Sequence, residues 1–239
     1  MKHILIILSL FLMNSHVFSQ NTQITSFSKS KKLLLKLYKA HPVTLYCGCS
    51  FNGKKPDLSS CGYIPKKDNK RANRIEWEHV VPAHAFGQSF PEWRVGHPKC
   101  VSKKGKKYKG RRCAEKVDKQ YRRMQADMFN LYPAIGEVNG RRSNYSMAII
   151  EGEKREFGKC DVEIKNKKVE PRESIRGEIA RTYMYMDSAY PGRGIISKKN
   201  RKLFEAWNKI DPVDEWECDR AKRIERIQGN RNEVVMVEC

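Results

Sequence analysis

The chain has 239 residues, with 48 Lys and Arg against 27 Asp and Glu, and a formal net charge of +21 at pH 7. After residue 20 no stretch approaches the ~18 uninterrupted apolar residues of a membrane-spanning helix. The basic residues are spread along the chain and do not form one cationic amphipathic helix, which disfavours a membrane surface as partner. The excess positive charge favours a nucleic acid, with solubility alone as the alternative.

The N-terminus has the pattern of a secretory signal peptide. Lys2 and His3 precede an apolar run from Ile4 to Met13, and Ser19 follows among short residues. This run is too short to span a bilayer. The alternative to a signal peptide is a buried N-terminal helix. We expect a signal peptide at residues 1–19, export to the periplasm or the medium, and one domain over residues 20–239.

All eight cysteines follow the expected cleavage point: Cys47, Cys49, Cys61, Cys100, Cys113, Cys160, Cys218 and Cys239. An even number in an exported chain predicts a disulfide framework. Zinc is the alternative, but the paired CxxC spacing of zinc sites does not occur. Sequence cannot choose among the pairings, and our one specific expectation is Cys100 with Cys113.

In chain order, the first elements predicted are a helix over 29–42 that Pro42 ends, a strand over 43–51 and a loop over 52–70. Alternation predicts a second strand over 74–81. Because neighbouring side chains point to opposite faces of a strand, Glu78 and His79 can share a site only where the strand ends, and Pro82 marks that end.

Residues 88–118 are predicted to be irregular and contain the basic run "KKGKKYKGRR" at 103–112. A block of like charges is typical of a solvated, mobile loop. The same block would also suit a flap that contacts phosphates, with Tyr108 as a stacking face.

Helical patterns dominate the remainder. We predict helices over 119–129, 171–190, 197–210 and 212–230, a turn at "NLYP" (130–133) and a further helical turn within 135–145. Ser197 suits an N-cap and Gly229 the position after a helix end. The chain is therefore expected to be mainly helical with a few strands.

The Glu78–His79 pair suggests phosphodiester hydrolysis. That reaction needs a group that deprotonates water, for which histidine has a suitable pKa, and positive charge beside the phosphate. Mg²⁺ can supply the charge with few protein ligands, all oxygens. Glu78 offers one, and Asn139 in "GEVNGRR" offers a second. His84 is expected to pack or to face solvent.

Seven motifs, in this order, resemble the endonuclease I family of bacterial periplasmic and secreted nucleases: "LYCGCSF", "SSCGY", "RANRIEWEHVVPAHAFG", "ADMFNLYPAIGEVNGRRSNY", "RGEIARTYMYM", "AWNKIDPVDEWEC" and "RIQGN". The resemblance implies an α+β fold: a mostly helical, disulfide-bonded single domain with a small antiparallel sheet and a ββα-metal (His-Me finger) motif. It implies His79 as general base, Glu78 and Asn139 as ligands of Mg²⁺ (Mn²⁺ or Ca²⁺ as alternatives), and Asn130 as the residue that braces the finger loop.

The resemblance further implies cleavage of DNA, and often of RNA, with little sequence preference and with 5′-phosphate products. We expect a monomer whose contacts to nucleic acid come from Arg74, Arg94, Lys99, Arg141 and Arg142.

One departure from the family bears on activity. The family commonly has a phosphate-binding arginine in a small disulfide hairpin, where "RVGHPKC" places His97. Arg94, Lys99 and His97 are the candidates to replace it. A cationic nucleic-acid-binding protein without catalysis is therefore the alternative function.

Overall fold

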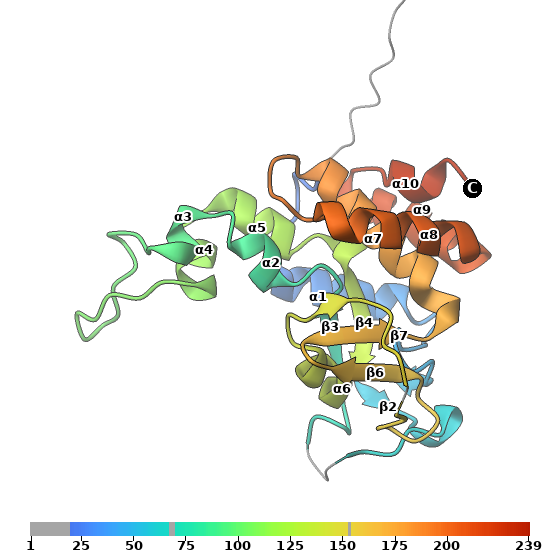
Figure 1. The fold of residues 1–239 in the computed structure, drawn as a ribbon. Helices are drawn as coiled ribbons and strands as arrows, with labels where there is room; N and C mark the ends of the chain where they lie inside the picture. Colours follow the sequence, from blue (N-terminus) through green and yellow to red (C-terminus); the bar gives the residue numbers. More distant parts are fainter. Residues whose placement is uncertain (1–19, 67–69, 153) are drawn as a thin grey trace, which may run out of the picture.

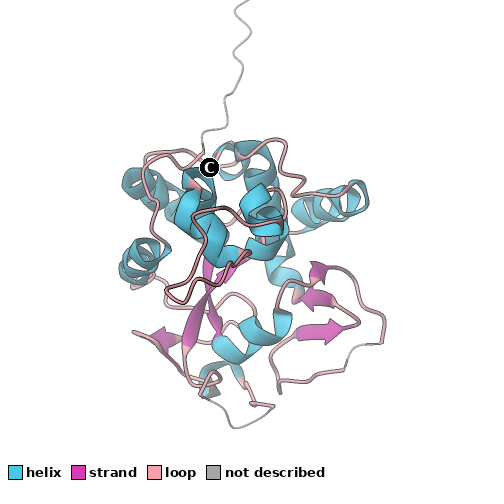
Figure 2. Ribbon diagram, turned by 90° about the vertical axis from the view of Figure 1, so that its left-hand side faces the viewer, coloured by secondary structure: helices cyan, strands magenta, loops and turns pink. Residues whose placement is uncertain are grey.

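The structure is a computed structural model that describes residues 20–66, 70–152 and 154–239. The predicted signal peptide lies outside these residues. In Figure 1 the helices α7 (Arg176–Ala189), α8 (Lys198–Ile210), α9 (Glu215–Gln228) and α10 (Glu233–Met236) gather at one end, and the short strands lie toward the other. Figure 2 shows the same division from the side. Among the described residues no helix is both long enough and apolar enough to cross a bilayer.

Helix α1 (Phe27–Leu37) begins where Ser26 caps it, because the Ser26 hydroxyl accepts a hydrogen bond from the Lys29 amide at 3.2 Å. The strand predicted over 43–51 is wrong. This segment makes turns, joined by an isolated bridge between Val43 and Ser50, before the two-residue strands β1 (Phe51–Asn52) and β2 (Lys55–Pro56). Gly48 has a φ of +68°, which breaks an extended conformation.

The central unit consists of two antiparallel strands and a helix. Strand β3 (Ile75–His79) pairs with β4 (Leu131–Ile135), and α6 (Gly136–Arg142) follows directly. The prediction of β3 is confirmed, and so is the helical turn after residue 135. The predicted "NLYP" turn is wrong, since residues 131–135 form a fully buried strand. The order strand, strand, helix is that of a ββα unit.

Between the paired strands the chain forms four short helices: α2 (Ala83–Gly87), α3 (Pro91–Arg94), α4 (Arg111–Val117) and α5 (Lys119–Gln125). The segment 88–118 is thus less irregular than predicted. A hairpin joins α3 to α4, and the Cys100–Cys113 disulfide closes it. This confirms the expected pairing. The hairpin projects from the body at the left of Figure 1.

A three-stranded sheet was not predicted. Its strands are β5 (Ser146–Met147), β6 (Val162–Lys165) and β7 (Lys168–Pro171), in the order β5-β7-β6. The β6–β7 pair is antiparallel and the β5–β7 pair parallel. A disulfide between Cys47 and Cys160 ties the segment before β6 to the N-terminal turns.

Three of the four C-terminal helices match the predicted pattern, although the first begins later than predicted because residues 168–171 belong to β7, and the short last helix was not predicted. The four are α7 (Arg176–Ala189), α8 (Lys198–Ile210), α9 (Glu215–Gln228) and α10 (Glu233–Met236), and 3₁₀ turns cover Ser59–Cys61, Met128–Asn130 and Glu173–Ile175. Ser197 caps α8 through the Asn200 amide at 3.2 Å, and Gly229 ends α9 with a φ of +77°. Both capping predictions are confirmed.

Two further disulfides join Cys49 to Cys61 and Cys218 to Cys239, so all eight cysteines are paired. The zinc alternative is therefore wrong for the cysteines. The mixed architecture and the four disulfides confirm the predicted α+β, mostly helical single domain. The predicted small antiparallel sheet corresponds to the β3–β4 pair.

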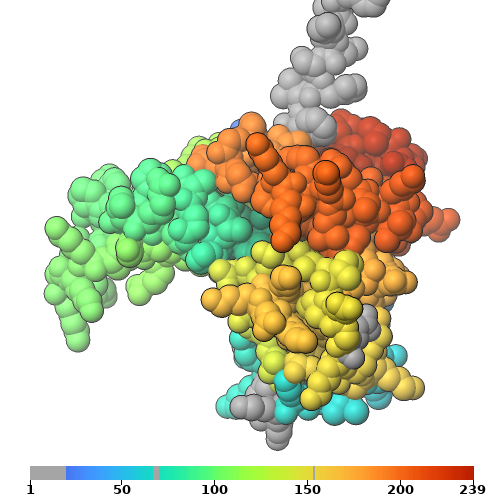
Figure 3. Space-filling view, in the orientation of Figure 1, coloured from blue at the N-terminus to red at the C-terminus, as the bar shows by residue number. Residues whose placement is uncertain are grey.

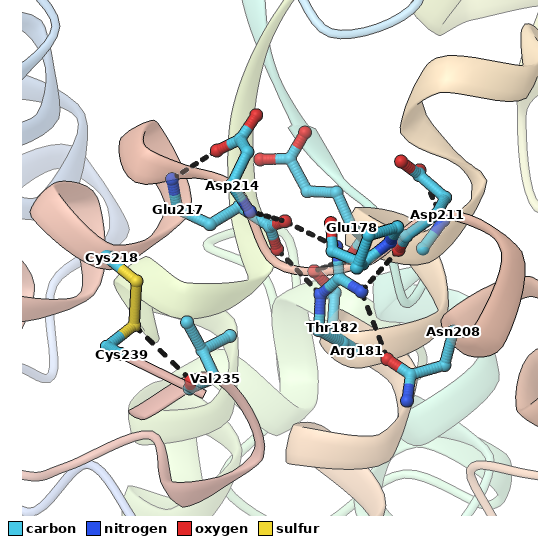
Figure 4. Close-up of polar contacts among 12 residues, drawn as sticks. Glu178, Arg181, Thr182, Asn208, Asp211, Asp214, Glu217, Cys218, Val235 and Cys239 are labelled. Atoms are coloured by element: carbon cyan, nitrogen blue, oxygen red, sulfur yellow. Dashed lines mark hydrogen bonds and ion pairs between the residues drawn. A yellow bond between two sulfur atoms is a disulfide. The ribbon is translucent and has the colours of Figure 1, made fainter. Parts of the chain in front are cut away.

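A buried ion pair joins α7 to α9. The Arg181 Nε donates to Glu217 Oε1 at 2.8 Å, and the two side chains are only 2% and 7% exposed. Arg181 Nη1 also donates to Asn208 Oδ1 at 3.0 Å and to the Asp211 carbonyl, as Figure 4 shows. Removing one partner of such a pair leaves the other charged and desolvated, which costs more than the pair contributes.

We expect Glu217→Ala to lower the free energy of unfolding by about 3–5 kcal/mol, because it leaves the buried Arg181 guanidinium without its carboxylate partner. Asp219→Ala is the matched control: it removes an acid from the same helix, and the Asp219–Arg223 pair is 42% and 40% exposed. The control should cost under ~1 kcal/mol. Urea unfolding of the disulfide-bonded proteins measures both, and equal losses would contradict a special role for the buried pair.

Candidate functional site

A cavity of about 1050 Å³ opens where α1, β3, α2, α4 and α6 meet. Its lining includes the adjacent residues Glu78 and His79 and also Asn139, which is remote from them along the chain. The structure therefore places three of the predicted site residues around one space. Lys31, Arg71 and Arg111 add positive charge to its walls, which suits an anionic ligand.

Glu78 is 2% exposed and lies near the end of β3. Its Oε1 accepts a hydrogen bond from the Tyr46 hydroxyl at 2.9 Å and lies 3.2 Å from Arg142 Nη1. Burial raises the pKa of Glu78, while the charge of Arg142 and the hydroxyl of Tyr46 oppose that rise. No hydrogen bond from a described residue reaches the second oxygen, Oε2, which is therefore available to a ligand.

His79 ends β3, and the rings of Phe27 and Phe86 lie 4.8 and 6.3 Å from its imidazole. Its Nε2 lies 2.9 Å from the Gln125 carbonyl. A carbonyl only accepts, so Nε2 carries the hydrogen and the lone pair is on Nδ1. Burial lowers the pKa of His79 to about 3, and the positive charge of Arg111 acts in the same direction. The ring is therefore neutral at neutral pH and can accept a proton.

Asn130 fixes the chain that leaves His79. It is fully buried, its Oδ1 accepts from the Val81 amide at 2.7 Å, and its Nδ2 donates to the Val81 carbonyl at 3.0 Å. The Val80 amide also donates to the Asn130 carbonyl at 3.1 Å. These bonds join the ends of β3 and β4 beyond the ladder. Asn130 does not line the cavity, so it acts on the site through the backbone.

Asn139 lies on α6 and lines the cavity. Its Nδ2 donates to Glu76 Oε2 at 3.1 Å, and no described residue donates to its Oδ1. Arg74 Nη2 donates to Glu76 Oε1 at 2.7 Å, and Arg71 also pairs with that carboxylate. Glu76 thus orients the Asn139 amide and holds two arginines at the rim.

Arg142 was expected to contact nucleic acid, but the structure places it inside. It is 1% exposed, and besides pairing with Glu78 it donates to the His79 carbonyl at 3.1 Å and to the Val80 carbonyl at 2.6 Å. With these bonds made, its guanidinium braces the end of β3, and the residue also forms part of the cavity lining.

The other predicted contact residues are dispersed. Arg74 lines the cavity, whereas Arg94 and Lys99 are exposed outside its lining. Arg141 points elsewhere, because its Nη2 donates to Glu156 Oε2 at 3.1 Å and its guanidinium lies 5.7 Å from the Phe157 ring. His97, the third candidate for the missing arginine, accepts the Lys99 amide through Nδ1 at 3.1 Å and is also outside the lining.

Arg111, like Lys31 and Arg71, is a cation of the cavity that was not among the predicted site residues. It begins α4 and lines the cavity, and its guanidinium lies 5.5 Å from the Phe27 ring centroid, the ring that packs on His79. Its Nε donates to Gln125 Oε1 at 2.7 Å. Gln125 therefore holds two site residues, His79 by its carbonyl and Arg111 by its side chain. A signal was present, since Arg111 stands two residues before Cys113 in the disulfide hairpin.

The free oxygens fit a hard cation. Glu78 and Asn139 both line this cavity, and no described residue donates a hydrogen bond to Glu78 Oε2 or Asn139 Oδ1. Carboxylate and amide oxygens are ligands that Mg²⁺, Mn²⁺ and Ca²⁺ accept. The described residues contain no cluster of three or more His, Cys, Asp and Glu that could hold a metal ion. The site therefore fits an ion that keeps most of its water, and it does not fit a zinc cage.

The sequence also matches a known protein family. The sequence model of the endonuclease I family matches residues 11–237.

The chain belongs to the endonuclease I family.

Three relatives show how far the similarity extends. An extracellular deoxyribonuclease of Aeromonas hydrophila is 45% identical over 223 residues, which cover 90% of each protein. A periplasmic deoxyribonuclease of the same species is 43% identical over 227 residues, 92% of this chain and 89% of that protein. Endonuclease-1 of Buchnera aphidicola (subspecies Acyrthosiphon pisum, strain APS) is 43% identical over 235 residues, 96% of this chain and 88% of that protein.

Membership of the endonuclease I family makes the chain a nuclease, a hydrolase that cleaves within nucleic acids. The predicted localisation, periplasmic or secreted, is confirmed by relatives named as extracellular and periplasmic and accords with four disulfides. The predicted resemblance to endonuclease I is likewise confirmed.

We expect Gln125→Ala to lower kcat/KM for plasmid cleavage about 10-fold, because it frees the Arg111 side chain while the backbone carbonyl that holds His79 remains. If Gln125 acts through Arg111, the effect disappears in an Arg111→Ala background. Gln120→Ala is the matched control: it lies on the same helix and holds Arg193, which is outside the cavity lining. Additive losses in the double variant, or an equal loss in the control, would contradict this coupling.

Proposed function

We propose that the chain is an exported, metal-dependent endonuclease that hydrolyses phosphodiester bonds of DNA, and of RNA, without sequence preference. The observation that carries the proposal is the convergence of Glu78, His79 and Asn139 on one cationic cavity. Residues 1–19 would be the signal peptide and residues 20–239 the nuclease, acting as a monomer.

His79 is the proposed general base. With Nε2 bonded to the Gln125 carbonyl, Nδ1 can take a proton from water as the water oxygen bonds to phosphorus. The bond from phosphorus to the 3′ oxygen then breaks, and that oxygen takes a proton to become a hydroxyl. The new phosphate monoester remains on the 5′ side of the neighbouring nucleotide, which gives 5′-phosphate ends. The lowered pKa of His79 keeps the ring unprotonated before the reaction.

Glu78 and Asn139 are the proposed ligands of Mg²⁺, with Mn²⁺ or Ca²⁺ as substitutes. The ion would supply positive charge at the phosphate and the departing oxygen. Tyr46 and Arg142 hold Oε1 of Glu78 and so direct Oε2 toward the ion. Glu76 holds the Asn139 amide in the same way.

Arg111 is the proposed phosphate contact in place of the family's hairpin arginine. Arg111 suits that role because it lines the cavity and lies at the base of a disulfide hairpin. A guanidinium can donate two parallel hydrogen bonds to phosphate oxygens. Arg94 and Lys99, with Arg74 and Arg141, remain proposed contacts to neighbouring phosphates. Such contacts recognise the backbone and carry no base information.

Asn130 is a proposed positioning residue. Its paired bonds to Val81 set the path of the chain immediately after His79, and so the angle at which the imidazole enters the cavity.

We expect purified, disulfide-bonded protein to nick and then fragment supercoiled plasmid in Mg²⁺, and EDTA to abolish the cleavage. His79→Ala should reduce the rate by ~10²–10⁴-fold without loss of DNA affinity, because it removes only the base. His97→Ala is the control, a histidine outside the cavity lining. Incubation with RNA under the same conditions tests whether the protein also cleaves RNA.

Full turnover by His79→Ala would refute the assignment of the base. Salt-sensitive DNA binding with no cleavage in Mg²⁺, Mn²⁺ or Ca²⁺ would instead select the alternative, a cationic binding protein without catalysis.

A further inference from the structure

The hairpin between α3 and α4 carries more positive charge than catalysis at one phosphate requires. Between Glu92 and Glu115 the chain has no acidic residue and nine basic ones: Arg94, Lys99, Lys103, Lys104, Lys106, Lys107, Lys109, Arg111 and Arg112. All nine are exposed. None of them forms an ion pair with an acidic residue in the described parts of the chain. The charge is therefore available to an external polyanion.

This segment is a folded hairpin. The Cys100–Cys113 disulfide closes its base, and a bridge pairs Val101 with Lys107. The Ser102 amide donates to the Lys106 carbonyl at 2.9 Å, and the Tyr108 amide donates to the Cys100 carbonyl at 2.9 Å. The backbone that carries the lysines is thus already folded, so a ligand need not order the whole segment on binding.

Tyr108 does not offer the open stacking face that the sequence suggested. Arg112 and Lys116 lie 5.3 and 5.9 Å from its ring centroid. The tyrosine instead supports two cations of the hairpin, and recognition there depends on charge.

The hairpin is continuous with the cavity. Arg111 lines the cavity and closely follows the lysines in the chain. Figure 3 shows the hairpin extending from the body beyond the surrounding surface, at the left of the view. A strand whose scissile phosphate lies at Arg111 could continue along this extension.

We propose that the lysine hairpin, residues 100–113, is a second nucleic-acid contact that grips the phosphates flanking the cleavage point. The inference rests on the proposed function in that it takes the cavity as the place of cleavage. The partner it selects is a long nucleic acid, and a duplex above all, because a duplex presents the denser line of phosphates.

The reach of the hairpin sets its footprint. Its turn at Gly105 is five residues from Cys100, so the tip lies up to about 17 Å from the disulfide at ~3.3 Å per residue. Phosphates along one strand of a duplex are spaced by about 3.4 Å along the axis. The hairpin can therefore extend contact by up to about five base pairs.

An anionic membrane would be the other polyanion. Membrane-surface binding by a chain segment uses an amphipathic helix with an apolar face, whereas the residues of this hairpin from 102 to 107 are Ser, Gly and Lys. The composition and the junction with the cavity both favour nucleic acid.

The test compares two variants of equal charge in the full disulfide-bonded protein. One replaces the hairpin lysines (Lys103→Gln, Lys104→Gln, Lys106→Gln, Lys107→Gln). The control replaces four exposed lysines of α8 (Lys198→Gln, Lys199→Gln, Lys202→Gln, Lys209→Gln), which lie on the other side of the molecule in Figure 1. Affinity for DNA duplexes of about 8 and 40 base pairs is measured in EDTA across a KCl series, so that no cleavage occurs.

For the longer duplex we expect the hairpin variant to lose affinity at least ~10-fold at ~0.1 M salt, and the slope of log K against log salt to fall by about 2–4, near 0.9 per lost phosphate contact. The shorter duplex should be affected less, and the α8 control should bind within about 2-fold of the unaltered protein. Equal losses in the two variants, or none in the hairpin variant, overturn the proposal. Binding to vesicles of phosphatidylcholine with about 30% phosphatidylglycerol is measured in parallel. If the hairpin variant loses affinity for these vesicles alone and not for DNA, the proposal is also overturned.

Cleavage in Mg²⁺ is measured separately. If no protein cleaves but the affinity difference persists, the hairpin proposal stands and the proposed function fails. If all cleave and the affinities are equal, the proposed function stands and the hairpin proposal fails.

Discussion

The buried guanidinium of Arg142 is the contact on which the arrangement of the site depends. It lies at the end of α6 and binds Glu78 Oε1 at 3.2 Å and the carbonyls of His79 and Val80 at 3.1 and 2.6 Å. A buried charge must be compensated, and Arg142 and Glu78 are the two groups that compensate each other here: burial raises the pKa of Glu78, and the charge of Arg142 opposes that rise. This mutual compensation fixes a helix end to a strand end. Glu78 and His79, adjacent on that strand, are both buried and both line the one cavity.

A layer of polar contacts behind the site holds the backbone that supports it. Asp127 Oδ2 accepts the hydroxyls of Tyr185 and Tyr190 at 2.8 and 2.7 Å, and Gln228 Nε2 donates to Asp127 Oδ1 at 2.9 Å. Helices α7 and α9 thereby hold the turn that leads into Asn130 and β4. Because every member of such a network is bonded, it rigidifies the turn. The C-terminal helices thus keep the backbone around Asn130, and through it the chain after His79, in one conformation.

Rigidity around the cavity and charge outside it both accord with the proposed cleavage of nucleic acid without sequence preference. The cavity holds a neutral imidazole and two free oxygens beside Arg111, so it is suited to the chemistry of a single phosphodiester. The formal charge of +21 is far more than one phosphate needs. Contacts between spread cations and a phosphate backbone are insensitive to base identity and strongly dependent on salt. An exported nuclease with this distribution of charge would depend on its ionic surroundings for affinity more than for turnover.

Local patterns determined the amphipathic helices α7 to α9, the strand that carries Glu78 and His79, the caps at Ser197 and Gly229, and the disulfide that closes a short loop. Each of these depends on residues near one another in the chain. The motifs that resemble endonuclease I also marked the residues that converge on the cavity. Tertiary structure alone decided that residues 131–135 are a buried strand in spite of Pro133, since only pairing with β3 makes that segment extended. It likewise decided that Arg142 is a brace and Arg111 faces the cavity. Both are arginines in basic stretches, and which of them is buried depends on whether a distant carboxylate meets it, a contact that no local pattern encodes.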